Sequence, residues 1–195
     1  MATLLNHLVQ WAFPIAVIAA LVQVIDQLLV KTKIVGPIKS GGGWIAFQAW
    51  AIYFLGGSVL IGGPSEGGAN GGLSALVSYI MAIIASIAIF ELAGAFGKLG
   101  FWSTPLSLVI LVTVVIFLMI APWPFAYVPA LFVGAGVFFG IMSYFPQIPG
   151  SFPEGASKWS NYISAGIGEL VYCVIGLAAG WLTVFVAGVI GTPFA

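Results

Sequence analysis

Six long apolar runs, separated by short polar connections, fill this chain of 195 residues. A membrane-spanning helix needs about 20 mostly apolar residues, and it satisfies its backbone hydrogen bonds internally because lipid offers no partners. The charged fraction is 5%, whereas soluble domains have about 25%. The sequence therefore predicts an all-α membrane protein with six transmembrane helices, folded as one bundle over residues 1–195. The six runs are Leu8–Val30, Trp44–Ile61, Leu73–Phe96, Pro105–Ala121, Phe125–Phe145 and Tyr162–Ile190.

The lysines predict the orientation of these helices. Lys31, Lys33 and Lys39 lie in the first connection, Lys98 in the third and Lys158 in the fifth. If all six runs span, the odd-numbered connections share one side, and cytoplasmic loops of membrane proteins collect positive charge. We therefore expect a multi-pass protein of the cell inner membrane with both termini outside the cytoplasm. No basic residue precedes the first run, so we expect a retained helix and not a cleaved signal peptide.

Several function classes lack the residues that they need. Arginine is absent, which argues against a nucleic-acid partner, since phosphate recognition relies on clustered Lys and Arg. His7 is the only histidine and Cys173 the only cysteine, so we expect no metal site and no cofactor. No phosphate-binding loop, nucleotide fingerprint or Ser-His-Asp set can be assembled. The protein is therefore not expected to be an enzyme.

A similar polar break interrupts each half of the chain: "GGPSEGGANGG" begins at Gly62, and "GSFPEGASKW" begins at Gly150. In both halves a spanning helix and a shorter aromatic helix precede the break, and a long helix follows it. Three helices per half reverse the direction of the second copy, which predicts a 3+3 inverted repeat over about 8–96 and 105–190. Glycine-rich breaks in such folds expose backbone groups to a solute. Otherwise they are ordinary surface loops. The polar break residues assigned to a solute pathway are Glu66, Asn70 and Glu154.

Two segments carry a family resemblance. The stretch "GWIAFQAWAIYFLGG", followed by "GGL" at Gly71, and the stretch "AYVPALFVGAGVFFG" resemble an uncharacterised family of short bacterial inner-membrane proteins typified by YcdZ. The resemblance implies a multi-spanning inner-membrane protein and supplies no substrate. That family tends to have a lysine directly after Gly-Gly-Leu, whereas this chain has Ser74, so a basic role there does not carry over.

Glu169 is the most deeply placed carboxylate. It lies ten residues beyond Trp159, or roughly 15 Å of helix rise. Tyr172 and Cys173 follow at i+3 and i+4, on the same face. A carboxyl inside a membrane is costly and is by default a functional candidate. The prediction is a proton relay or a hydrogen-bond acceptor for a solute. The equal alternative is a protonated group that joins two helices.

Two further acids are candidates for a gate or vestibule. Glu91 precedes Lys98 by two helical turns, which favours an interfacial ion pair over a gate. Asp26 belongs to a polar stripe with Gln23 and Gln27 at i, i+3 and i+4 spacing. Such a stripe faces the bundle or a wet vestibule, or else it marks the end of the hydrocarbon layer.

Aromatic residues recur at helical spacing in the second run. Trp44, Phe47, Trp50 and Phe54 are assigned to a solute-lining constriction. A packed core or a lipid-facing stripe is the more common role for such a pattern.

Small residues four apart predict close helix contacts, within the bundle or between subunits of a homo-oligomer. They are the pair Gly136 and Gly140 and the pair Gly176 and Gly180.

Two functions agree with these patterns. The first is a membrane channel or transporter, with the lipid bilayer and a small solute as its partners. With no arginine and no lysine inside the runs, the solute is expected to be neutral or weakly ionisable, such as urea, a short amide, ammonia or a small carboxylic acid. The alternative is a non-catalytic accessory subunit of a larger membrane complex.

Overall fold

The structure is a computed structural model that describes residues 12–54, 69–120 and 128–190. The apolar runs form helices there because a helix buries side chains and also satisfies its own backbone. No strand occurs in these residues. The long helices in these ranges are α2 (Phe13–Leu29), α3 (Gly42–Ile52), α4 (Ala69–Ala95), α5 (Ser103–Ile120), α6 (Val128–Tyr144) and α7 (Lys158–Ile190), with short 3-10 helices at Gly97–Trp102 and Phe145–Gln147.

Each predicted apolar run overlaps one long helix, so the all-α prediction is confirmed for the described residues. Among the described residues, four helical segments are long and apolar enough to cross a membrane: Gly72–Ala95, Gly97–Val114, Pro129–Gln147 and Lys158–Ile190. The helix at Phe13–Leu29 is apolar but shorter, and α3 has 11 described residues. Both α2 and α3 adjoin residues outside the described ranges. The apolar helices indicate a protein embedded in a membrane.

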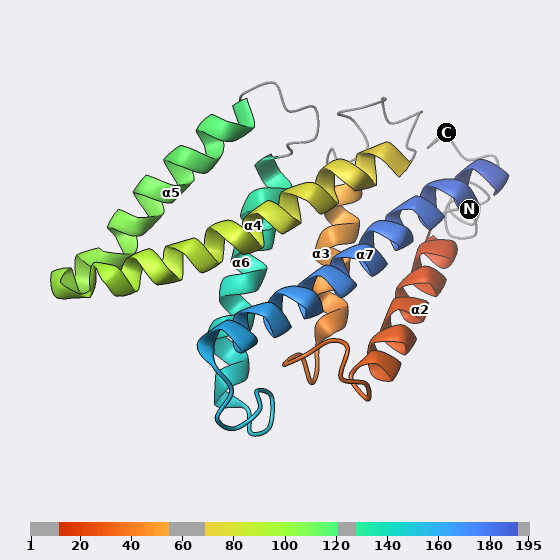
Figure 1. Ribbon diagram of the computed structural model, residues 1–195. Helices are drawn as coiled ribbons and strands as arrows, with labels where there is room; N and C mark the ends of the chain where they lie inside the picture. The colour runs from red at the N-terminus through yellow and green to blue at the C-terminus, as the bar shows by residue number, and fades with distance from the viewer. Residues whose placement is uncertain (1–11, 55–68, 121–127, 191–195) are drawn as a thin grey trace.

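Helix α7 packs against α2, α3, α4 and α6. Gly176 on α7 faces Ala46, and Gly180 faces Tyr53, so α3 runs parallel to α7. Helix α2 runs the opposite way, with its first residues near the last turn of α7 in Figure 1 and its last turns beside Tyr172.

Helix α4 runs antiparallel to α7. Ile83 lies against Gly166, and one end of α4 brings Glu91 to Lys158 at the start of α7. The turn at Gly97–Trp102 then reverses the chain into α5, which packs on α4 at the edge of the bundle (Figure 1).

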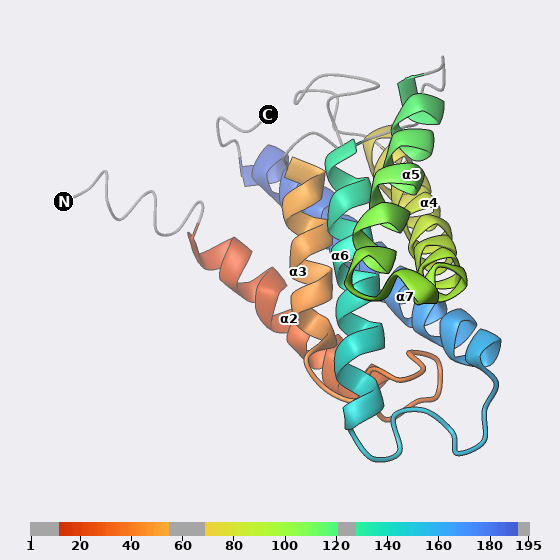
Figure 2. The same cartoon turned by 90° about the vertical axis from the view of Figure 1, so that its left-hand side faces the viewer.

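Helix α6 packs along α4 in the same direction. Gly134 lies against Ala82, and further along both helices the rings of Phe139 and Phe90 are 4.7 Å apart. The described helices therefore alternate in direction along the chain, as seen in Figures 1 and 2. The connections 30–41 and 145–157 lie together at the bottom of both views.

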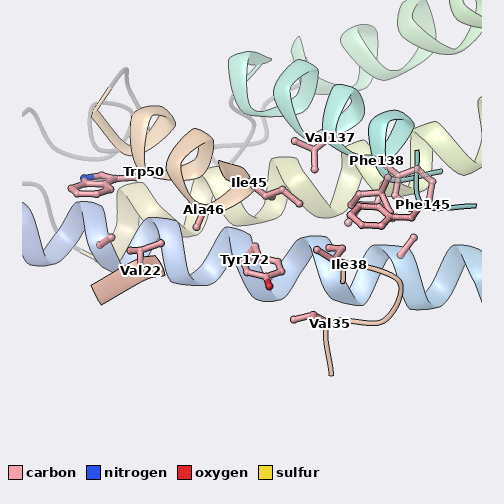
Figure 3. Close-up of a cluster of buried hydrophobic side chains, with 14 of the residues drawn as sticks. Val22, Val35, Ile38, Ile45, Ala46, Trp50, Val137, Phe138, Phe145 and Tyr172 are labelled. Carbon is pink, nitrogen blue, oxygen red and sulfur yellow. The ribbon is translucent and has the colours of Figure 1, made fainter. Parts of the chain in front are cut away.

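The core lies between α3, α6 and α7, where the connection between α2 and α3 folds back beneath them (Figure 3). Val35 and Ile38 of this connection are fully buried, so it is a packed part of the bundle. Phe138 from α6 and Ile45 from α3 fill the space above α7. Burying apolar area against neighbouring helices fixes the arrangement through dispersion contacts, since lipid itself is as apolar as these side chains.

The two glycine-rich breaks are shorter than their sequences suggest. Helix α4 begins at Ala69, inside the first break, and α7 begins at Lys158, inside the second. The hydroxyl of Ser157 accepts the backbone N–H of Ser160 at 3.2 Å, so it satisfies a donor at the start of α7. Residues 62–68 of the first break lie outside the described residues.

Candidate functional site

Glu169 lies on the face of α7 that packs against α4. Its neighbour Gly166 is so close to α4 that an added Cβ would lie 3.0 Å from Ile83. The Glu169 side chain is 0% exposed, and within the described part of the chain neither carboxyl oxygen has a hydrogen-bond partner. A buried polar group without a partner costs several kcal/mol in a hydrocarbon environment. Glu169 therefore carries a cost that its packing does not offset.

The side of α4 that faces Glu169 is also polar. The side chain of Tyr79 is fully buried, and it interacts electrostatically with Glu169 and Cys173. Its hydroxyl has no hydrogen-bond partner among the described residues. The buried hydroxyls of Ser74 and Ser86, at other turns of α4, also lack a partner among the described residues. Unsatisfied buried polar atoms are scarce in folded proteins, so each of them calls for an explanation.

These α4 hydroxyls were missed by the sequence analysis, which gave weight to charged residues. The signal that could have found them is their polarity, since Ser74, Tyr79 and Ser86 interrupt a run that is otherwise mostly apolar.

Asp26 and Tyr172 form a second buried polar contact, on the side of α7 that faces α2. The Tyr172 hydroxyl donates a hydrogen bond of 2.5 Å to the Asp26 carboxylate, and both side chains are buried. The Tyr172 ring packs directly on Gly42, where a Cβ would overlap it. Gln23 reaches Gly43 at the start of α3 but is exposed, as is Gln27. Of the predicted polar stripe, only Asp26 is buried.

The aromatic residues of α3 do not form one lining. Trp50 is 7% exposed and belongs to the core, where its ring centroid lies 6.1 Å from that of Phe47. Trp44 and Phe54 point outward, with 45% and 40% exposed. The helix turns by about 100° per residue, so these four positions cover about a third of its circumference. Trp50 is buried while Trp44 and Phe54 are exposed, so the four side chains do not form a single buried lining.

Glu91 forms its ion pair with a different lysine from the one that the spacing predicts. Lys158 Nζ lies 2.7 Å from the Glu91 carboxylate, and Tyr162 also hydrogen-bonds to that carboxylate. Lys98 lies instead in the exposed turn after α4. Since α4 ends at Ala95, the helical spacing from Glu91 does not continue to Lys98. The predicted pairing of Glu91 with Lys98 is therefore wrong, and the ion pair instead joins α4 to α7.

Only Glu154 of the three break residues has a described side chain, and it is exposed, whereas Glu169 is buried. Glu154 lies in the loop between α6 and α7, eight residues before Tyr162, the first buried residue of α7. Asn70 lies in the first turn of α4, and its side chain is not among those described. Glu66 lies outside the described residues.

The two glycine pairs differ. Gly176 and Gly180 fit tightly against Ala49 and Tyr53 of α3, where added Cβ atoms would lie 2.8 and 2.6 Å away. Gly136 and Gly140 have nothing within 4 Å of an added Cβ. The prediction of close helix contacts is confirmed inside the chain for α7 only.

In the part of the chain that the structure describes, no group of three or more His, Cys, Asp or Glu side chains converges to hold a metal ion. The arrangement offers one buried carboxyl, a tyrosine and a thiol within one turn of α7 and the facing turn of α4. These groups can exchange a proton or hydrogen-bond a small polar molecule.

No family model, curated protein or solved structure matches this chain. The resemblance to the YcdZ family stays a prediction.

Proposed function

We propose that the protein is a membrane transporter for a small neutral or weakly ionisable solute, with Glu169 as the group that binds the solute or its proton. The observation that carries this proposal is the fully buried Glu169 carboxyl, which lacks a hydrogen-bond partner among the described residues. An unsatisfied carboxyl is expensive inside a membrane bundle, so a function that uses it accounts for its presence.

The closed packing favours a carrier over a permanently open channel. Glu169 is 0% exposed, so no water-sized space touches it in this state. A solute reaches it only if α4 and α7 separate. Alternating access, in which one part of a bundle moves against the other around a central site, provides such a movement.

The pairing of helices supports the 3+3 inverted repeat. In such a repeat α2 corresponds to α5, α3 to α6, and α4 to α7. The parallel pair α3 and α7 then corresponds to the parallel pair α6 and α4. In the same way, the contact of α2 with α7 corresponds to the contact of α5 with α4. The contact between α4 and α7 corresponds to itself. Glu169 and Tyr79 then lie at the seam between the halves, where transporters of this architecture bind their substrates.

The lysines support the proposed orientation. Lys31 and Lys33 follow α2, Lys39 precedes α3, Lys98 follows α4, and Lys158 begins α7. We infer six spans, with this end of the bundle at the cytoplasmic face of the inner membrane and both termini on the other side. The family resemblance likewise implies a multi-spanning protein of the inner membrane.

The chemistry around Glu169 limits the solute. Within the described residues no lysine lies among the buried side chains of the bundle, so a strongly charged anion has no counter-ion there. A carboxyl, a tyrosine hydroxyl and apolar walls suit urea, a short amide, ammonia or a small carboxylic acid taken up in its neutral form.

The test is solute flux into vesicles that contain the purified protein. Wild type is compared with Glu169→Gln and with Glu154→Gln, whose exposed carboxylate makes it a matched control. We expect wild-type vesicles to take up one of the candidate solutes faster than empty vesicles. Glu169→Gln should reduce that uptake at least tenfold, and Glu154→Gln should leave it within twofold of wild type.

The alternative is an accessory subunit that contributes no site. The observation in its favour is the same closed packing around Glu169. Uptake no faster than in empty vesicles for every candidate solute, together with copurification of a partner protein from the native membrane, would select this alternative. Unchanged uptake in Glu169→Gln would retain transport but remove Glu169 from its mechanism.

A further inference from the structure

A hollow of about 490 Å³ lies at the lysine end of the bundle, between the connection that follows α2 and the first turns of α7. Its volume falls in the range of ligand sites, about 300–1,000 Å³. Lys33 and Gly36 line one side, and Ser157, Ser160 and Ser164 line the other.

Both walls of the hollow are held in place. Gly36 has a φ of 57° and fits directly against Ser164, where any side chain would overlap the α7 backbone. One turn further on, a Cβ at Gly168 would lie 2.5 Å from the carbonyl oxygen of Val35. The connection therefore lies firmly on α7, and the hollow is a built feature of the fold.

The lining of the hollow is polar at the start of α7 and mixed further along it. Hydroxyls stand at Ser157 and Ser160, and the exposed side chains of Ile163 and Ile167 follow, with Ser164 between them. Ten residues separate the first of these from the last, or about 15 Å of helix rise. Trp159, which also lines the hollow, is exposed and is of the type enriched at membrane interfaces. This order matches a phospholipid, whose polar headgroup continues into acyl chains.

The charge of the hollow selects the headgroup. No carboxylate lines it, and Lys33 forms no ion pair within the described part of the chain. The charge of nearby Lys158, in contrast, is already balanced by Glu91. A lysine and several hydroxyl donors without an acid suit a phosphate group.

We propose that this hollow binds one anionic phospholipid of the cytoplasmic leaflet. Lys33 and the serine hydroxyls hold its phosphate, and Ile163 and Ile167 contact its acyl chains. A soluble phosphate compound would contact only the polar part of the hollow, whereas a lipid would also contact the isoleucines with its acyl chains. The site is separate from Glu169 and does not depend on transport.

The test is lipid binding by native mass spectrometry of the purified protein with equal amounts of phosphatidylglycerol and phosphatidylcholine. We expect wild type to retain one phosphatidylglycerol molecule in preference to phosphatidylcholine. Lys33→Gln should lower that preference about fivefold, the factor for loss of one lysine near an anionic surface. Lys98→Gln is the matched control, because Lys98 is also exposed at this end but lies outside the hollow, and it should leave the preference within twofold of wild type.

A second arm separates a lipid from a soluble anion. Glycerol phosphate, which has the charged group but no acyl chains, should not raise the melting temperature of the protein in detergent, whereas phosphatidylglycerol should. Equal losses in Lys33→Gln and Lys98→Gln would overturn the proposal, since they indicate general attraction to the anionic lipid. Stabilisation by glycerol phosphate as strong as by the lipid would overturn it as well.

Discussion

Replacing Gly176 with alanine tests the contact on which the α3 and α7 pairing depends. A Cβ at this position would overlap the carbonyl oxygen of Ala46 and lie 2.8 Å from the Ala49 Cβ. Carbon atoms in ordinary contact are about 3.5–4.0 Å apart, so the two helices must separate by about 1 Å. The obstacle is backbone and a short side chain, and neither can rotate away.

Overpacking of a core costs about 1–3 kcal/mol, and we expect Gly176→Ala to reach the upper end because the whole of α3 must move. At about 2–4 °C per kcal/mol for a protein of this size, the melting temperature should fall by about 6–12 °C. The measurement is thermal unfolding in detergent, followed by circular dichroism.

Gly188→Ala is the matched control on the same helix, because nothing lies within 4 Å of a Cβ there. Its melting temperature should stay within about 2 °C of wild type or rise slightly, since alanine favours helix. A Gly176→Ala protein that melts within the same interval as Gly188→Ala would refute the close approach of α3 and α7.

Two other predictions concern buried groups of α7. Tyr172→Phe removes the hydroxyl that donates to Asp26 and leaves that buried carboxyl without its donor, so we expect a loss of about 1–3 kcal/mol in unfolding free energy. Adding Asp26→Asn to Tyr172→Phe should cost less than the sum of the single changes, and strict additivity in denaturant unfolding would contradict the contact. Cys173 is 0% exposed, so a maleimide reagent should modify the folded protein at least tenfold more slowly than the unfolded protein, as followed by mass spectrometry. Complete labelling of the folded protein in detergent at the unfolded rate would show that the core around Glu169 is open.

The helices were predictable because each arises from an apolar run that is visible in the local sequence. A run such as Leu73–Phe96 is long, apolar and free of proline, and only a helix satisfies such a backbone in lipid. The ends were less predictable, since α4 extends back to Ala69 and α7 to Lys158, into segments rich in glycine and serine. Polar residues there continue the helix because hydrogen bonds such as that of Ser157 satisfy its first turn.

Within the candidate site, only the acidic residue Glu169 was predictable from the sequence. Glu169 stands out because an acid in a long apolar run is rare. Its neighbour Tyr79 lies 90 positions earlier in the chain, and nothing local in either segment indicates that the two helices meet. The same holds for Glu91, whose local spacing favours Lys98 while the fold gives it Lys158.

The sequence by itself determined that the protein is helical, that it is apolar enough for a membrane, and that one deep carboxyl needs an explanation. Those properties follow from composition and periodicity, which act over a few turns of one helix. Tertiary structure alone decided that Asp26 turns to Tyr172, that Gly176 and not Gly136 permits a close contact, and that Lys33 and three serines enclose a hollow. Each of these depends on which helices lie side by side, and the packing of side chains from distant segments sets that choice.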